Sequence, residues 1–185
     1  KKIILLFVIM FLFNITDSHS QLEPAQNLQM GIRALEGQDY TEAVDYLTQY
    51  LKTVPQDAEG RYSRATAYYY LQDYGNALKD VTTAIGTTTN FSPALNLRGL
   101  IYTAQQMYDQ AITDFNAAIT ANVNYGEAYM NRALVYKIQK GYPLAVADLN
   151  SALTINPALI EAYYIRGEIL VSMGNYNDAI NDLTT

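Results

Sequence analysis

The apolar and polar positions of this chain recur with a fixed period of 34 residues, without insertion or deletion. An alanine marks each period, at Ala43, Ala77, Ala111, Ala145 and Ala179. Three residues before each alanine there is a tyrosine, at Tyr40, Tyr74, Tyr108, Tyr142 and Tyr176. Twelve residues before each alanine the residue is small, at Gly31, Ala65, Gly99, Ala133 and Gly167. Such a period predicts a repeat protein in which similar units stack in a row.

One unit, Gly126 to Pro157, shows the elements that the pattern predicts. The residues from Glu127 to Ile138 are apolar enough for an almost fully apolar helix. Gly141 is placed to stop this helix, and Pro143 to begin a second one over Leu144 to Ile155. We expect the small residue of the first helix to face the repeated alanine of the second. Neither helix buries its apolar face alone, so each pair must pack on its neighbours.

The order of small residue, tyrosine, alanine, large aliphatic residue, alanine and proline resembles the tetratricopeptide repeat (TPR) family. In this unit the order is carried by Ala133, Tyr142, Ala145, Leu149, Ala152 and Pro157. The resemblance implies an all-α fold, a right-handed α-solenoid of stacked antiparallel helix pairs. It covers residues 21–185, with units near 24–57, 58–91, 92–125, 126–159 and 160–185, the last one truncated.

A charged pair recurs inside units two to five. An arginine precedes the small residue, at Arg64, Arg98, Arg132 and Arg166, and an aspartate follows sixteen positions later, at Asp80, Asp114, Asp148 and Asp182. Unit one has Met30 and Tyr46 instead. Because both members are lost together, we expect each pair to join the two helices of its own unit. The alternative is that both groups are solvated and independent.

The resemblance also implies a binding surface, because the first helices of such a solenoid line its concave side. The side chains expected to project into this groove are Tyr62, Thr66, Tyr69, Asn96, Leu100, Thr103, Met130, Leu134, Lys137, Tyr164 and Glu168. They favour an extended or helical apolar peptide held by aromatic contacts. Only Asn96 and Lys137 fit the family's clamp for a C-terminal carboxylate. The alternative for Tyr62 and Tyr69 is that they pack on neighbouring side chains.

Composition excludes several kinds of function. The chain has no cysteine, and its one histidine is His19. Thiolate and imidazole, the usual nucleophile, base and metal ligand, are thus absent from the repeats, so we expect neither an enzyme nor a cofactor or metal site. The net charge of −6 and the lack of a basic run exclude a nucleic-acid partner.

The first twenty residues lie outside the repeat. Two lysines precede an apolar run from Ile3 to Phe13, and small residues flank His19. This pattern predicts a signal peptide that is cleaved between Ser20 and Gln21, giving an exported protein, periplasmic or secreted. The membrane is then a transient partner, whereas an uncleaved N-terminal anchor is the alternative. The missing initiator methionine and the end at Thr185 within a predicted helix indicate a fragment of a longer protein.

Two functional classes follow from these features. The first is a non-catalytic protein-protein interaction scaffold, exported, that binds a peptide or protein segment in the concave groove. The second is a TPR spacer or regulatory arm of a larger enzyme or secretion assembly whose remainder lies beyond residue 185. The repeats do not identify the partner, because one fold of this kind serves many functions.

Signal cleavage gives a direct test of the location. When the full gene is expressed in its host, the exported protein should begin at Gln21, because signal peptidase cuts after small residues such as Ser20. Mass spectrometry of the intact protein measures this. A mature protein that still contains Lys1 would show that the N-terminus is not a cleaved signal.

Overall fold

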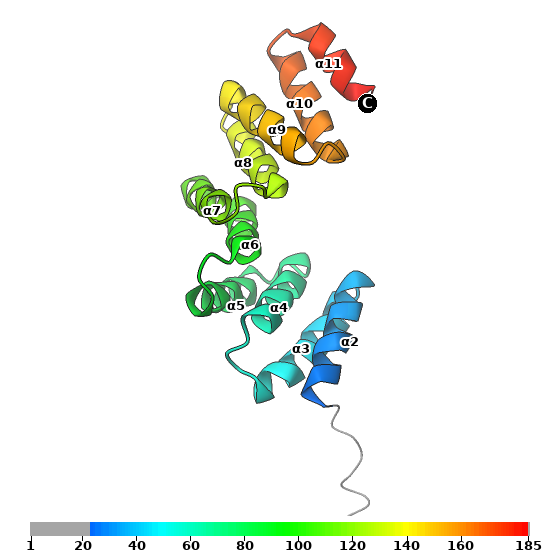
Figure 1. Ribbon diagram of the computed structural model, residues 1–185, viewed down its shortest axis with the longest axis vertical. Helices are drawn as coiled ribbons and strands as arrows, with labels where there is room; N and C mark the ends of the chain where they lie inside the picture. The colour runs from blue at the N-terminus through cyan, green and yellow to red at the C-terminus, as the bar shows by residue number, and fades with distance from the viewer. Residues whose placement is uncertain (1–22, 185) are drawn as a thin grey trace, which may run out of the picture.

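The computed structural model describes residues 23–184, which form ten α-helices and no strand (Figure 1). The helices are α2 (Pro24–Glu36), α3 (Tyr40–Thr53), α4 (Ala58–Tyr70), α5 (Tyr74–Thr87), α6 (Ser92–Ala104), α7 (Tyr108–Ala121), α8 (Gly126–Ile138), α9 (Tyr142–Ile155), α10 (Ile160–Ser172) and α11 (Tyr176–Leu183). They pair into five successive hairpins, stacked as a right-handed α-solenoid. The predicted signal, Lys1 to Ser20, lies outside the described residues.

The connections are as regular as the sequence period. Three residues join the two helices of every unit, and four residues join each unit to the next. The repeated tyrosine is the first residue of the second helix in every unit, so Tyr142 begins α9 two residues before the predicted start. In units one and two an aspartate caps this helix: Asp39 and Asp73 accept hydrogen bonds from the backbone N–H groups of Glu42 and Asn76. The second helix of each unit therefore begins earlier than we expected from the sequence.

The residue that ends each first helix is also not the one we expected. Gly141 has an ordinary φ of −78°, so its assignment as the helix stop is wrong. The preceding residue, Lys140, adopts the left-handed conformation with φ 60°. The Lys140 and Gly141 N–H groups then donate to the carbonyl oxygens of Lys137 and Tyr136, which closes the helix end. The same turn position is left-handed in every unit, at Gln38, Gln72, Gln106, Lys140 and Gly174.

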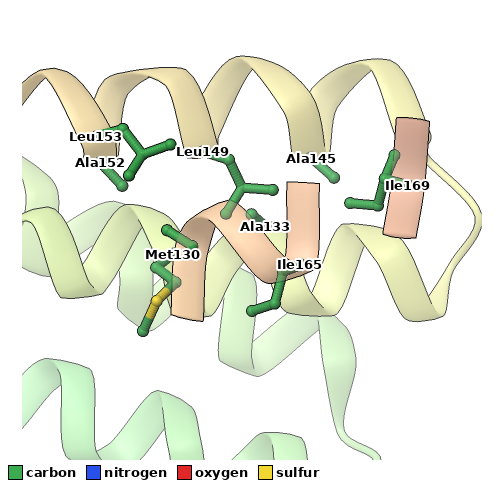
Figure 2. Packing of buried hydrophobic residues seen from close by; sticks show 9 residues of the cluster. Met130, Ala133, Ala145, Leu149, Ala152, Leu153, Ile165 and Ile169 are labelled. Carbon is green, nitrogen blue, oxygen red and sulfur yellow. The ribbon is translucent and has the colours of Figure 1, made fainter. Parts of the chain in front are cut away.

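The core is continuous from one unit to the next. Figure 2 shows side chains of α8, α9 and α10 that meet in one cluster. Unit five, through α10, therefore contributes to this part of the core together with unit four. The members are Met130, Ala133, Ala145, Leu149, Ala152, Leu153, Ala162, Ile165 and Ile169. Because α10 belongs to the next unit, the apolar faces of α8 and α9 are buried only when the units stack. No helix within residues 23–184 has the length and apolarity needed to cross a membrane.

The small residue of the first helix does not face the repeated alanine of the second helix, as we had expected. A Cβ atom on Gly99 would lie 2.6 Å from Cε1 of the fully buried Phe115, which is sixteen residues later, and no atom of Ala111 is as close. A Cβ on Gly31 would lie 2.6 Å from Leu47 Cγ in the same way. The small residue thus makes room for the large residue of the second helix, rather than facing the repeated alanine.

This contact predicts the effect of one added methyl group. Gly99→Ala should lower the free energy of unfolding by ~1–3 kcal/mol through overpacking against Phe115. This cost exceeds the ~0.5–1 kcal/mol that alanine normally gains over glycine inside a helix. The midpoint of urea unfolding, followed by the helical circular dichroism signal, measures the change.

Two matched variants test the cause. Gly86→Ala in α5 meets no atom within 4 Å, so it should be neutral or stabilising. Gly99→Ala combined with Phe115→Leu reproduces the Ala133 and Leu149 combination of unit four and should recover part of the loss. If Gly99→Ala alone is as stable as the parent, the helices do not approach at Phe115.

Candidate functional site

The first helices of the units form the inner side of the solenoid. Each of α2, α4, α6 and α8 contacts the next first helix, whereas the second helices of neighbouring units do not contact each other within residues 23–184. Elements on the inner side of a curved stack lie closer together than those on the outer side. The first helices therefore line the concave face, as the resemblance implied.

The eleven residues expected in the groove differ in how much of each side chain is free. Tyr164 is 56% exposed, whereas Asn96 and Met130 are only 6% and 9% exposed. Met130 packs in the core cluster with Ile165, so the expectation that packing leaves it free is wrong. The physical reason is that α10 covers this part of α8. The other eight candidates are half-buried: Tyr62, Thr66, Tyr69, Leu100, Thr103, Leu134, Lys137 and Glu168.

Two polar contacts join neighbouring first helices across this face. Asn131 Nδ2 of α8 donates to Asn96 Oδ1 of α6 at 3.0 Å. Lys137 Nζ of α8 donates to Glu168 Oε2 of α10 at 2.6 Å, in a pair whose side chains are 30% and 40% exposed. Lys137 and Glu168 were both candidates, and the fold brings them together. Neither charge is free for a ligand, because each already compensates the other.

A half-buried tyrosine that the sequence did not single out lies beside Asn96. Burial, and then the neighbouring Tyr62 and Glu127, raise the pKa of Tyr125 to about 12. A hydrogen bond with Asn96 acts on this pKa in the opposite direction. Tyr125 lies between units and belongs to no repeated tyrosine position. No sequence signal for it was present.

The two groove tyrosines of unit two pack on other rings. The Tyr62 ring lies 5.3 Å from that of Phe91, and burial raises the pKa of Tyr62. The Tyr69 ring lies 5.3 Å from Tyr70 and 6.1 Å from Tyr74. The alternative for these two residues, packing on neighbours, is thus observed. Each side chain is half-buried, so part of its ring still reaches the concave face.

The repeated arginines and aspartates form the predicted pairs within their own units. In unit four Arg132 Nε and Nη2 donate to the two carboxylate oxygens of Asp148, at 2.7 and 2.6 Å. The same two-point contact joins Arg64 to Asp80, Arg98 to Asp114 and Arg166 to Asp182. All four aspartates are buried. The solvated alternative is therefore wrong.

The third guanidinium nitrogen reaches the preceding unit. Arg166 Nη1 donates to Asn150 Oδ1 at 2.6 Å, and Arg64 Nη1 donates to Thr48 Oγ1 at 3.1 Å. Arg132 makes the equivalent contact with Asn116. Hydrogen bonding to Asp148 raises the pKa of Arg132, although burial acts in the opposite direction. Each of these arginines is thus held by the fold on both sides and is a structural residue.

The side chains on the concave face are mainly apolar and neutral hydrogen-bonding groups. Within residues 23–184 no three His, Cys, Asp or Glu side chains lie close enough together to hold a metal ion. The concave face presents tyrosine, threonine and leucine side chains and one neutralised ion pair. Such a face provides apolar and hydrogen-bonding contacts along its length. The fold and this face define a class of protein, the helical repeat scaffold.

Comparison with known families places the chain within this class. A family model described as tetratricopeptide repeat matches residues 28–90 and 96–160, and a second model of the same description matches residues 160–185. The chain belongs to the tetratricopeptide repeat family. The fold supports a protein-protein interaction scaffold, and its relatives are in general non-catalytic. A search of the curated proteins gave no match.

Solved structures of TPR proteins share the architecture. A MamA fragment from Desulfovibrio magneticus is 20% identical, with a TM-score of 0.72 over 89% of this chain and 94% of that chain. PilF of Pseudomonas aeruginosa is 18% identical, with a TM-score of 0.78 over 86% and 72%. A thermophilic TPR protein of Thermus thermophilus is 23% identical, with a TM-score of 0.77 over 86% and 88%. At these identities the likeness concerns the fold alone.

The buried ion pairs predict a strong coupling between their members. A double-mutant cycle with Arg132→Met and Asp148→Asn should give a coupling free energy above ~1 kcal/mol. The reason is that loss of one partner leaves the other charge or its hydrogen-bonding groups buried without compensation. Urea unfolding of the four proteins measures the coupling.

The exposed pair on the concave face is the matched control. The same cycle on Lys137 and Glu168 should give only the ~0.2–1 kcal/mol of a solvent-accessible pair. Equal coupling free energies at the two sites would mean that burial does not strengthen the coupling between Arg132 and Asp148.

Proposed function

We propose that this protein is an exported, non-catalytic scaffold whose concave face binds an extended or helical segment of a partner protein. The observation that supports this most is the row of accessible side chains on successive first helices. Leu100 of α6 and Leu134 of α8 lie at the same repeat position, and Tyr164 of α10 lies one helical turn before that position, so the three are on contacting helices. A partner segment running along the solenoid would meet each of them in turn.

The charge on this face indicates the chemistry of the segment. Lys137 is paired with Glu168, and Asn96 with Asn131, so the two residues that fit a carboxylate clamp are already engaged. Anchoring of a C-terminal carboxylate is thus poorly supported. Apolar side chains that contact Leu134 and the Tyr164 ring fit the face better. The hydroxyl groups of Thr66 and Thr103 donate to carbonyl oxygens of their own helices, so each can only accept a hydrogen bond from the segment.

The export part of the proposal has separate support from the sequence. The two N-terminal lysines, the apolar run from Ile3 to Phe13 and the small residues Ser18 and Ser20 are arranged as in a signal peptide. The partner is then another protein of the exported compartment, or one that faces it.

A second role, as an arm of a larger assembly, is supported by the apolar face of α11. Leu183 is 49% exposed, although the residues at its position in units three and four, Phe115 and Leu149, are fully buried. Ile180 on the same helix is also exposed. Another helix packed on this face would bury both, as each following unit does elsewhere.

The groove proposal is tested by a double variant, Leu134→Ser with Tyr164→Ser. Peptides selected against the parent chain should bind this variant at least about tenfold more weakly, because ~1.4 kcal/mol of apolar contact corresponds to a tenfold change. Isothermal titration calorimetry measures the affinity. Neither side chain is buried, so the melting temperature should change little.

Lys79→Glu provides the control, because Lys79 is exposed on α5, one of the outer helices. This variant should bind the selected peptides like the parent. If Lys79→Glu abolishes binding and the double variant retains it, the partner binds the convex side and the proposal is wrong.

A further inference from the structure

Four tyrosine rings form a continuous cluster where the hairpins of units one and two turn. The Tyr40 and Tyr70 rings are stacked with centroids 4.6 Å apart and planes 12° from parallel. The Tyr69 ring contacts Tyr70 edge-on at 5.3 Å and Tyr74 at 6.1 Å. Tyr40 and Tyr74 begin α3 and α5, and Tyr69 and Tyr70 end α4. We call these four residues the tyrosine cluster.

The repeat does not account for the central ring of this cluster. Tyr40 and Tyr74 occupy the tyrosine position common to all units, but Tyr70 does not. Its place is taken in the other units by Glu36, Ala104, Ile138 and Ser172. The Tyr70 side chain is 55% exposed, so burial in the core is not its role. A large aromatic ring that packing does not require is a candidate for binding.

The cluster also differs from the other tyrosines in what lies over its rings. Arginines of the chain itself lie 5.5–6.0 Å from the ring centroids of four other tyrosines, Tyr68, Tyr129, Tyr136 and Tyr163. Among residues 23–184 no arginine or lysine lies over a ring of the cluster. Aromatic faces are electron-rich and attract cations, most strongly the planar guanidinium group. This protein thus uses such contacts internally and leaves one set of rings without a cation.

The surrounding charges favour a cationic ligand as well. Asp39 and Asp73 directly precede Tyr40 and Tyr74, and neither forms a salt bridge with another residue of 23–184. Their carboxylates accept hydrogen bonds from backbone N–H groups as helix caps, which leaves the negative charge in place. The two turns, residues 37–39 and 71–73, contain no basic residue. An arginine approaching the rings from these turns therefore meets carboxylates and no basic residue of the turns themselves.

We propose that the tyrosine cluster binds arginine side chains of an extended segment of a partner protein. The inference rests on the proposed function in that the ligand is a protein segment. It places the contact at the turn edge of units one and two, beside the α4 end of the groove and away from the part formed by α6, α8 and α10. Tyr69 belongs to both surfaces, so one segment passes from the groove to the cluster without leaving the protein.

The test uses two synthetic peptides and one surface residue. The first peptide alternates arginine with proline and serine, and in the second every arginine is replaced by citrulline, which has the same shape without the charge. The arginine peptide should bind about 2- to 30-fold more tightly for each guanidinium engaged. Calorimetric titration gives both affinities. Equal binding of the two peptides, or no binding of the arginine peptide, overturns the proposal.

Variants of Tyr70 locate the contact. Tyr70→Phe keeps the aromatic face and should bind the arginine peptide like the parent, whereas Tyr70→Leu keeps only apolar area and should lose the preference over citrulline. Tyr176→Leu is the matched control, because Tyr176 is 63% exposed at the position equivalent to Tyr40 and Tyr74 but contacts no other ring. Retained preference in Tyr70→Leu contradicts the proposal. If Tyr70→Leu does not fold, Tyr74→Leu and the citrulline comparison on the parent decide.

The groove variant separates this proposal from the previous one. Leu134→Ser with Tyr164→Ser should leave the affinity for the arginine peptide unchanged, because neither residue belongs to the cluster. If this variant loses the arginine peptide while Tyr70→Leu keeps it, the groove binds the peptide and the cluster inference is wrong. If both surfaces fail to bind any peptide, both proposals are wrong.

Discussion

The contact between the two helices of each unit is the constraint on which the other features of this protein depend. A glycine or alanine in the first helix allows the large side chain sixteen residues later to pack against the helix backbone, as Gly99 does for Phe115. Arg98 and Asp114 directly precede these two residues in the chain. Bringing Gly99 and Phe115 together therefore also places the guanidinium and the carboxylate opposite each other, at 2.7 Å.

The arginine of the ion pair also forms a hydrogen bond with the preceding hairpin. The free nitrogen of Arg166 reaches Asn150, so the same side chain that joins α10 to α11 also contacts α9. A buried ion pair is not strong evidence of stability, because desolvation of the charges offsets their attraction. Unit one shows that the ion pair is not needed to form a hairpin. There Met30 and Tyr46 replace the pair, and α2 and α3 still form a hairpin of the same length. What the pair adds is a defined geometry between successive units.

The repeat period was sufficient to predict the fold, the helix pairs and the partners of the arginines. These features depend on which positions are equivalent, and a period of 34 residues states this directly. Local details were harder to predict. Lys140 rather than Gly141 is left-handed, because the hydrogen bonds that close the helix select a position and accept several residue types there. The tyrosine at Tyr142 begins a helix instead of ending a turn.

The candidate site was less predictable than the fold for a related reason. Equivalence of positions does not fix how far a side chain is covered by the next unit. Met130 and Tyr164 are one period apart, yet one is buried and the other exposed, because α10 covers the first and no first helix within residues 23–184 covers the second. The side chain of Asn96 accepts a hydrogen bond from Asn131, and the spacing of the repeat did not indicate this contact.

The same reasoning indicates where specificity in this scaffold originates. Tyr108 and Ala111 stand at positions that recur in every unit, and both pack in the core cluster around Phe115. Residues that break the period are not required by packing, and Tyr70 and the Lys137 pair are of this kind. Since one fold serves many partners, the chemical differences between partners must be matched by such departures from the repeat. In the two proposed functions the stack supplies the frame, and the irregular positions on its inner face and turn edge supply the chemistry of recognition.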